Sequence, residues 1–575
     1  AVDRLVPMCG EFQRIALSAT VRPLHSVAEF LGGYRLEGHP HTAHYSPRSV
    51  KLIESCQKKR YRIEVRFPEA AVRWDGRESF WQPFVDEIKN IILRNRSTLI
   101  FANSRRLCEK ITHLVNQDEE SPIAYAHHGS LSHEIRTEVE RKLKAGELRA
   151  IVATNSLELG IDIGTLDQVV LLQSPPSLSS AIQRIGRAGH RVGEVSDGAL
   201  FPIQPGEIVH NAVLAAGVLD QEIEGVHPIQ APLDVLAQII VSMVGVEPWS
   251  VDELYAWIKT SYPYRSISRQ QFDLVLNMLD GRYAGSRLRE LKPRIAVDRL
   301  SNTATIRKGA LQDLYFSGGT IPDRGYFHLR HQESRARIGE LDEEFVWEAR
   351  VGQVFTLGTQ NWKIERITHN DVFALPAHPA ATAPPFWRAE ENLRGFYLSE
   401  RIGYFLQMAD EKLDDPHFKE ALQKVHCLDK TASGELISFL KRQKEETRCG
   451  LPHRHHVLAE HVDTGPGGYP GNQIVLHTLW GGRVNRPYAM ALEAAWEEHF
   501  GYRPQVYPSN DCLMLQLPHE VGADEIFSLV SSSSVQSLLK KKLEGSGFFA
   551  ARFRECAGRA LLLTRRKMNE RMPLW

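Results

Sequence analysis

The sequence of 575 residues has few of the features that mark a specialised class of protein. Its seven cysteines are scattered and form no Cys-x-x-Cys pair, which argues for free thiols in a reducing compartment, the cytoplasm. No run of about 18 apolar residues occurs, so a membrane span is not expected. Lysine plus arginine and aspartate plus glutamate number 70 each, so no overall basic charge indicates a nucleic-acid partner.

A metal site is not indicated either. Histidines gather near Cys449, at His453, His455, His456 and His461, but their spacing matches no established zinc pattern. We therefore expect no metal ligands in this chain.

Positive charge is concentrated in local clusters. The clearest are Lys58-Lys59-Arg60, followed by Arg62 and Arg66, and Lys540-Lys541-Lys542. Most runs of this kind are solvated faces, and that interpretation stays open beside a contact with nucleic acid.

The most informative stretch is the block Gln-Arg-Ile-Gly-Arg-Ala-Gly-His-Arg, from Gln183 to Arg191. Arg184 and Arg187 can each present a planar guanidinium fork to phosphate oxygens, and the glycines suit a closely packed backbone. In phosphoryl transfer, such an arginine stabilises charge on the transferring group. A solvated basic start of a helix is the alternative if the block is taken alone.

Strand-like and helix-like segments alternate around this block. The expected elements are strands at Leu99–Phe101, Ala150–Ala153 and Asp167–Leu172, and helices at Arg105–Asn116 and His133–Ala145. This alternation argues for right-handed βαβ units and a parallel sheet. Ligands of such sheets bind beyond the carboxyl ends of the strands, where the loops with Ser104, Asn155 and Asp162 fall.

The next segment has a helical pattern. Ser250-x-x-Glu253 and Ser268-x-x-Gln271 read as capping boxes that open two helices, after an amphipathic face between Leu233 and Val244. An extended pair around Arg294–Val297 and Thr303–Arg307 follows. Three helices and a hairpin predict a winged helix, with helices that only brace their neighbour as the alternative.

Four segments resemble motifs III to VI of superfamily 2 helicases, in order. They are Ser18-Ala19-Thr20, Asn103-Ser104-Arg105, the run from Thr154 to Asp162, and the arginine block. Five segments resemble the large helicase-related (Lhr) family. They are HHGSLS (127–132), ATNSLELGIDIG (153–164), QRIGRAGHR (183–191), GTIPDRG (319–325) and PPFWR (384–388). The resemblance spans nearly the whole chain.

This resemblance implies roles for individual residues. Arg187 is the expected arginine finger, with Arg184 as the second catalytic residue. Nucleotide contacts are expected from Gly160, Asp162, Arg184, Arg187, His190 and Arg191. Many superfamily 2 members carry arginine where this chain has His190. Strand contacts are expected from Ser104, Arg105, His128, Gly129, Thr154, Asn155 and Ser156, which position a strand without reading its sequence.

Outside the helicase motifs, Trp387 is the strongest candidate for a contact with nucleic acid. Pro384 and Pro385 stiffen its approach and Arg388 follows it, so its ring can offer a stacking face to an unpaired base. A tryptophan that fills a domain interface is the alternative, and the resemblance favours stacking. Ile321 is a weaker candidate for an apolar contact with a base.

Two motifs that such a motor needs are absent. No Gly-Lys-Ser or Gly-Lys-Thr occurs for a phosphate-binding loop, and no Asp-Glu-x-His run occurs to hold magnesium. The expectation is therefore a piece of a longer protein, cut inside the first motor lobe, with a split or degenerate gene product as the alternative.

The fold class we predict is multidomain α/β, with a RecA-like parallel-sheet lobe, a winged helix, and a mixed β-barrel and α+β C-terminal region. The expected domains are a first-lobe remnant (1–35), a connector (36–62), a second RecA-like lobe (63–204), a winged helix (205–308) and an Lhr-type C-terminal domain (309–575, its β-barrel part 309–389 and its α+β part 390–575).

The resemblance implies an ATP-dependent 3′-to-5′ helicase on DNA or RNA–DNA hybrids, in DNA repair. ATP and Mg²⁺ are the implied cofactors of the complete protein. The implied partners are single-stranded DNA or an RNA–DNA hybrid and the missing N-terminal RecA-like lobe, and no membrane. A non-catalytic module that binds single strands is the alternative, and this chain alone is expected to be inactive.

Overall fold

A computed structural model describes most of the chain. It covers residues 2–18, 20–39, 42–54, 59–73, 80–128, 133–145, 147–158, 166–189, 193–282, 292–320, 326–342, 346, 349–357, 360–368, 370–377, 393–464 and 470–563. The chain forms two compact units, each built from separate stretches of sequence. One comprises Ala1–Glu54, Gly225–Ala389 and Leu543–Trp575, and the other Ser55–Glu224 and Glu390–Lys542.

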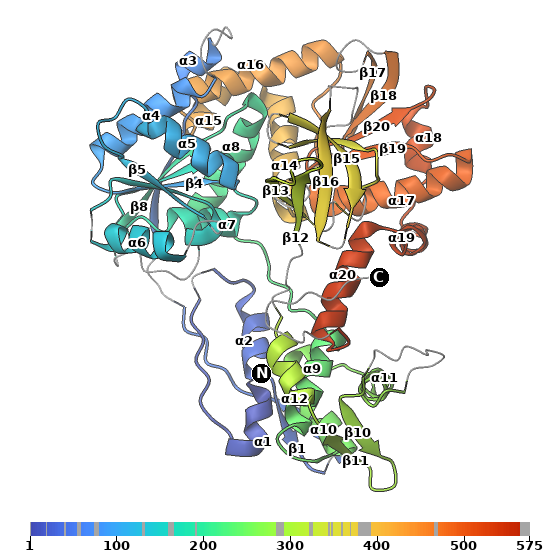
Figure 1. Cartoon of the computed structure of the whole chain (residues 1–575). Coiled ribbons are helices and arrows are strands. Elements are labelled where there is room, and N and C mark those ends of the chain that lie inside the picture. Colours follow the sequence, from blue (N-terminus) through green and yellow to red (C-terminus); the bar gives the residue numbers. More distant parts are fainter. Residues whose placement is uncertain are drawn as a thin grey trace. The chain divides into compact units, whose positions relative to one another are not determined.

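A six-stranded sheet is the framework of the second unit (Figure 1). Its strand order is β3-β8-β7-β4-β6-β5, and every neighbouring pair is parallel. The strands are β3 (Arg60–Val65), β4 (Thr98–Ala102), β5 (Ala124–His127), β6 (Ala150–Ala153), β7 (Gln168–Leu172) and β8 (Val195–Phe201). The predicted parallel sheet is confirmed.

Helices connect most of these strands, and a further helix follows the last of them. They are α3 (Glu69–Val72), α4 (Gln82–Arg94), α5 (Arg105–Asn116), α6 (His133–Lys144), α7 (Leu178–Ile185) and α8 (Pro205–Leu219). Every residue of β4 is buried, as expected for a central strand with both faces covered. Helix α5 has the predicted limits, because the hydroxyl of Ser104 accepts a hydrogen bond from the amide of Leu107 at 3.1 Å.

Three later helices share the hydrophobic core of this sheet. They are α14 (Phe396–Lys412), α15 (Phe418–Val425) and α16 (Lys430–Thr447). The edge of the sheet is bonded to the α15–α16 connection, since the amide of Val65 donates to the carbonyl of Cys427 at 2.8 Å and the amide of Asp429 donates to Val65 at 2.9 Å. The sequence predicted these segments as parts of separate domains, and those limits stay predictions.

The second unit also holds an antiparallel sheet with order β17-β18-β20-β19. Its elements and their helices are β17 (Leu458–Thr464), β18 (Pro470–His477), α17 (Gly482–Phe500), β19 (Gln505–Pro508), β20 (Leu513–Leu517), α18 (Ala523–Ser528) and α19 (Val535–Leu543). The fully buried indole of Trp496, on α17, lies in the core that this sheet shares with α17.

The first unit contains the predicted winged helix. Its elements are α9 (Leu233–Val244), β9 (Trp249–Ser250), α10 (Val251–Ile258), α11 (Arg269–Leu279), β10 (Ile295–Asp298), β11 (Thr303–Ile306) and α12 (Ala310–Ser317). Strands β10 and β11 form the expected antiparallel hairpin. The capping box of α11 is confirmed, since Ser268 and Gln271 each bond the backbone amide of the other at 3.1 Å.

The capping box predicted at Ser250 is wrong. The Ser250 side chain makes no capping bond, although the residue does precede α10. Ser250 instead belongs to β9, which pairs with β11, and the amide of Val251 donates to the carbonyl of Asn302 at 2.9 Å. The hairpin turn thus bonds the first amide of α10, while the serine hydroxyl makes no capping bond.

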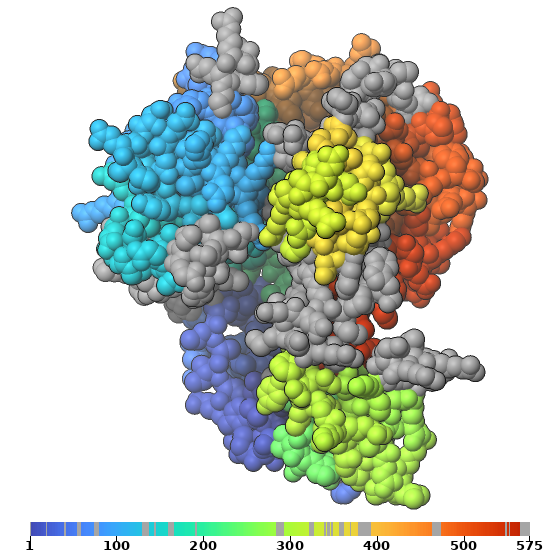
Figure 2. All heavy atoms as spheres, viewed as in Figure 1, coloured from blue at the N-terminus to red at the C-terminus, as the bar shows by residue number. Residues whose placement is uncertain are grey.

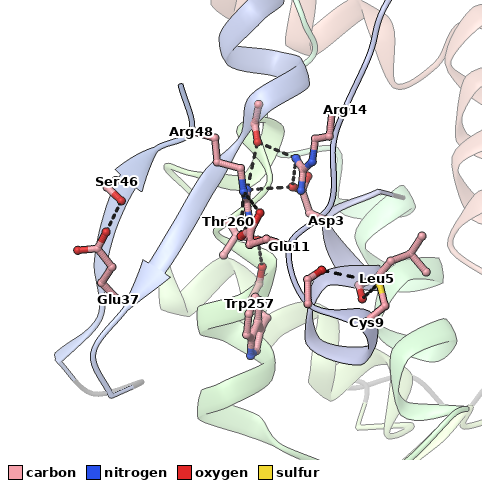
Figure 3. A network of polar contacts seen from close by, with 12 residues as sticks. Asp3, Leu5, Cys9, Glu11, Arg14, Glu37, Ser46, Arg48, Trp257 and Thr260 are labelled. Carbon is pink, nitrogen blue, oxygen red and sulfur yellow. Dashed lines mark hydrogen bonds and ion pairs between the residues drawn. The ribbon is translucent and has the colours of Figure 1, made fainter. Parts of the chain in front are cut away.

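The N-terminal stretch of the first unit is held by buried charge (Figure 3). Its elements are α1 (Val6–Cys9), α2 (Leu24–Gly32), β1 (Tyr34–Glu37) and β2 (His44–Pro47). Arg14 bonds Asp3 at 2.7 Å, and Arg14 and Arg48 both donate to the carbonyl of Gly32, at 2.6 and 3.1 Å. Strand β1 is bonded to the winged helix, since the amide of Tyr34 donates to the carbonyl of Thr260, just after α10, at 2.7 Å.

The predicted connector, 36–62, contains β2 and the start of β3. Strand β2 was not expected, because the proline-rich and polar composition there is typical of loops, and β3 begins three residues before the predicted limit. The limits 1–35 and 36–62 stay predictions.

The first unit also holds an open sheet of five strands, the yellow body in Figure 2. The strands are β12 (Tyr326–His331), β13 (Arg337–Asp342), β14 (Val354–Leu357), β15 (Gln360–Ile367) and β16 (Asp371–Ala377). The order is β13-β12-β16-β15-β14, and in the described residues the end strands β13 and β14 do not pair. The predicted β-barrel is therefore not confirmed, because strand periodicity does not reveal whether a sheet closes.

A distant helix, α20 (Gly547–Arg559), completes the first unit. Arg559 forms an ion pair with Asp234 on α9 at 2.6 Å, and Gln238 donates to the carbonyl of Arg559 at 2.7 Å. Leu561 is buried in the winged-helix core. Within the described ranges, no helix has both the length and the apolar character that crossing a membrane requires.

Gly189 provides a test of this packing. Its φ is 61°, and an added Cβ would lie 2.4 Å from the carbonyl oxygen of Val195. We expect Gly189→Ala to lower the free energy of unfolding by about 1–3 kcal/mol, because backbone must move. Gly193→Ala is the control, since Gly193 also has a positive φ but nothing within 4 Å of its Cβ position. Chemical unfolding that shows equal losses for both variants would contradict the steric argument.

Candidate nucleotide and nucleic-acid site

The loops that follow four strands meet at one edge of the parallel sheet. Asn103–Arg105 follow β4, His128 follows β5, Thr154–Ser156 follow β6 and Gln173 follows β7. Because neighbouring strands are parallel, their carboxyl ends lie together. The structure thus brings together the described residues for which sequence predicted strand contacts.

Arg184 lies under this edge as a buried charge. It is 4% exposed, its Nε donates to Glu158 Oε2 at 2.8 Å, and one terminal nitrogen donates to Asn103 Oδ1 at 3.1 Å. Its guanidinium also lies over the ring of Phe101, 5.1 Å from the centroid. Arg184 is therefore well placed to anchor the surrounding loops.

Arg187 is held by the same residue as Arg184. A terminal nitrogen of Arg187 donates to the backbone carbonyl of Glu158 at 2.6 Å. The side chain is half-buried; burial lowers the pKa of its guanidinium, and the charge of Glu158 opposes that shift. Glu158 thus contacts both predicted catalytic arginines, one through its carboxylate and one through its carbonyl.

The end of the arginine block is fixed to the sheet. The Lys59 ammonium donates to the carbonyl of Gly189 at 2.6 Å, and the Ser196 hydroxyl donates to the carbonyl of Ala188 at 2.7 Å. The amide of Gly189 donates to Leu166 at 3.3 Å. These bonds connect the block to β8 and to the segment that precedes β7.

The predicted strand-contacting residues differ in exposure. Arg105 and Asn155 are exposed, and Ser104 and Ser156 are partly buried. Thr154 is buried, at 9% exposure. The imidazole of His128 is buried too, with its Nε2 2.6 Å from Glu109 Oε1. Arg105 and Asn155 therefore present the most accessible polar groups of this set.

The neighbouring His127 was not predicted as a site residue. Its Nε2 lies 3.1 Å from Glu140 Oε1 and donates, because an ionised carboxylate only accepts. Its Nδ1 lies 2.9 Å from Ser156 Oγ, which connects the ends of β5 and β6. His127 thus supports the loop that carries Ser156.

Several predicted site residues lie outside the described residues. These are Gly129, Gly160, Asp162, His190, Arg191, Ile321 and Trp387. Their roles stay predictions. Glu158 was missed by the sequence reasoning, although its place beside Leu157, which is fully buried, was a signal, because a carboxylate next to the core needs a partner.

In the described part of the chain, no group of three or more His, Cys, Asp or Glu side chains is placed to hold a metal ion.

Three family models match the chain. They are described as "Helicase conserved C-terminal domain" (residues 84–192), "Large helicase-related protein, winged helix domain" (residues 216–383) and "DEAD/H associated" (residues 451–575). Together they match parts of both units.

Curated relatives match over nearly the whole chain. An "Lhr helicase/ probable uracil glycosylase" from Mycolicibacterium smegmatis is 35% identical over 98% of this chain and 39% of its own length. An "ATP-dependent helicase Lhr-Core protein 2" from Thermococcus barophilus is 30% identical over 100% of this chain and 66% of its own length. The chain thus spans less than two thirds of these relatives.

A solved structure is similar as well. The Mycobacterium smegmatis helicase Lhr, bound to single-stranded DNA and AMP-PNP, matches with a TM-score of 0.80 and 33% identity. The match covers 100% of this chain and 68% of that one.

The contact of Glu158 with Arg184 can be tested by substitution. Glu158→Ala leaves a buried guanidinium without its carboxylate, and we expect the free energy of unfolding to fall by about 3–5 kcal/mol. Glu158→Gln keeps an oxygen acceptor and should lose less. Glu138→Ala is the control, because its ion pair with Arg141 is exposed and solvent screens it. Urea unfolding measures the loss for each variant. If Glu158→Ala and Glu138→Ala lower the free energy of unfolding by the same amount, the anchoring role of Arg184 is refuted.

Proposed function

This chain belongs to the Lhr family of helicases, and we propose that it supplies the second RecA-like lobe and the accessory domains of an ATP-dependent motor. The motor translocates 3′-to-5′ on single-stranded DNA and unwinds DNA or RNA–DNA duplexes, in cytoplasmic DNA repair. The supporting observation is the gathering of motif residues at one sheet edge, in a chain similar along its full length to a helicase solved with single-stranded DNA and AMP-PNP. A non-catalytic binding module is not favoured, because the similarity extends through the motor motifs.

We assign the nucleotide contacts of this lobe to the arginine block and to the loop after β6. Arg187 is the proposed arginine finger. In this structure its guanidinium is held by the bond to the carbonyl of Glu158. Arg184, buried between Glu158 and Asn103, positions this arrangement. Gly160, Asp162, His190 and Arg191 are the other proposed contacts.

When bound, ATP supplies the phosphoryl group whose hydrolysis drives movement. The arginine block of this lobe fits one side of the ATP-binding site. The guanidinium groups suit phosphate oxygens. The sequence offers no lysine-bearing phosphate loop, and we assign Mg²⁺ to no residue of this chain. The N-terminal RecA-like lobe is proposed to supply both functions.

The proposed strand path follows the exposed loops of the same edge. Ser104, Arg105, Asn155 and Ser156 supply short polar groups and one charge for phosphates, which positions a strand whatever its sequence. Thr154, His128 and Gly129 contribute mainly through backbone. Ile321 and Trp387 are proposed to contact bases.

The chain alone should release no phosphate from ATP, with or without single-stranded DNA, because the phosphate loop is absent. Joined to the lobe that carries this loop, it should become active. In that longer protein we expect Arg187→Ala to lower turnover by about 10³-fold or more, because the arginine stabilises transferring charge. Steady-state phosphate release measures both.

Arg141→Ala is the matched control, since Arg141 is an exposed arginine on α6. Phosphate release by the chain alone above a mock preparation would refute the division of the site between lobes. An Arg187→Ala enzyme that keeps most of its turnover would refute the finger assignment.

Trp387 is proposed to stack on a base. Trp387→Ala should then weaken single-strand binding by about 1–3 kcal/mol and leave melting nearly unchanged. An interface plug would instead lose about 3–5 kcal/mol of stability. Trp496→Ala is the control for such a loss, since that indole is fully buried. A large drop in melting temperature with unchanged affinity of the folded fraction would end the stacking hypothesis.

A further inference from the structure

The second unit contains a cavity of about 530 Å³ at the edge of the parallel sheet. Asn103, after β4, and Ser174, after β7, line one side of it. After β4 the chain continues toward β5, on one side of the sheet, and after β7 it continues to β8, on the other side. Open α/β sheets bind ligands in the crevice at such a point.

The walls of the cavity are partly apolar. Pro175, Pro176, Phe439 and Pro452 line it, and these side chains give flat apolar surfaces. The volume lies within the usual range for sites that hold small organic groups. A planar ring would therefore have apolar surface available on its faces.

Polar groups line the rest of the cavity, and an ion pair is among them. Asp511 is paired with Arg394 at 2.7 Å; burial alone would raise the pKa of its carboxyl, yet His210 and Arg394 hold it well below its usual range. Glu207 accepts one bond, from the amide of Ile203 at 2.9 Å, and burial raises its pKa. Glu207 can accept a further bond from an N–H donor of a neutral ligand, and the guanidinium of Arg394 is already paired with Asp511.

The cavity wall is bonded to the arginine block. The amide nitrogen of Asn103 donates to the carbonyl of Ser174 at 2.9 Å, while its oxygen accepts from Arg184 at 3.1 Å. A ligand that moves Asn103 therefore disturbs Arg184 directly. This connection places the cavity one residue from the predicted nucleotide contacts.

We propose that this cavity receives one unpaired base of the bound strand, with the ring against the apolar wall and its N–H groups toward Glu207. A nucleobase is flat, neutral and rich in both donors and acceptors, and the strand path proposed above passes Ser104, the neighbour of Asn103. This inference rests on the proposed function, and its test separates the two.

Gly206, at the start of α8, allows the cavity to be filled without removing any contact. A Cβ added there would lie 3.7 Å from Phe439 Cζ, which is ordinary contact, and both residues line the cavity. Gly206→Phe should occupy the space proposed for the base. Gly206→Ala is the matched control, and thermal melting checks that both variants fold.

The experiment places 2-aminopurine, whose emission rises when it leaves the base stack, at each position of a single-stranded oligonucleotide in turn. With the unaltered 575-residue chain we expect one position to brighten. Gly206→Phe should abolish that signal and weaken binding about tenfold, and Gly206→Ala should do neither. An abasic site at the same position should weaken binding to the unaltered chain but add no further loss to Gly206→Phe.

Two results would overturn the base pocket and leave the proposed function standing. One is tight strand binding with no position that brightens, and the other is an abasic loss that Gly206→Phe leaves unchanged. Failure to bind any single strand would overturn the strand-binding function together with the pocket. Saturable binding of free adenosine, lost in Gly206→Phe, without a strand signal would assign the cavity to a free nucleoside instead.

Discussion

A charge that cannot reach water constrains the centre of the parallel sheet. Arg184 is buried, so its guanidinium must find partners from whatever loops surround it, and it takes them from the ends of β4 and β6. Neither loop can shift far without leaving a buried charge unsatisfied. The exposed groups of the same edge, such as Arg105 and Asn155, therefore lie on loops whose positions are fixed by the bonds to Arg184.

The parts of this arrangement that are local in sequence could be predicted. Ser104 caps α5 and Ser268 caps α11. Both caps could be predicted because each bond spans only three residues. The alternation of strands and helices was enough to infer a parallel sheet, which brings the motif loops together without any long-range information. Ser250 shows the limit of this reasoning, since it pairs with a hairpin strand about 50 residues away and makes no capping bond.

The parts that depend on distant partners could not be predicted. Nothing near Arg394 in sequence indicates that it will pair with Asp511, and nothing near Val65 indicates bonds to Cys427 and Asp429. The same holds for the assembly of each unit from separate stretches, and for whether β13 and β14 pair. Periodicity records which face of an element is buried, but not which segment buries it.

The docking of α20 has a consequence for how the protein is made. Leu561 fills the same core as α9, more than 300 residues earlier, and Asp234 and Gln238 on α9 have their partners at Arg559. During synthesis, α9 emerges long before this helix exists. The nascent winged helix therefore has an apolar surface uncovered while the later stretch of the second unit, Glu390–Lys542, is translated, and in such a state chains associate wrongly. This unit completes its fold late, and chaperones that shield apolar surface on the ribosome have an interval in which to act on it.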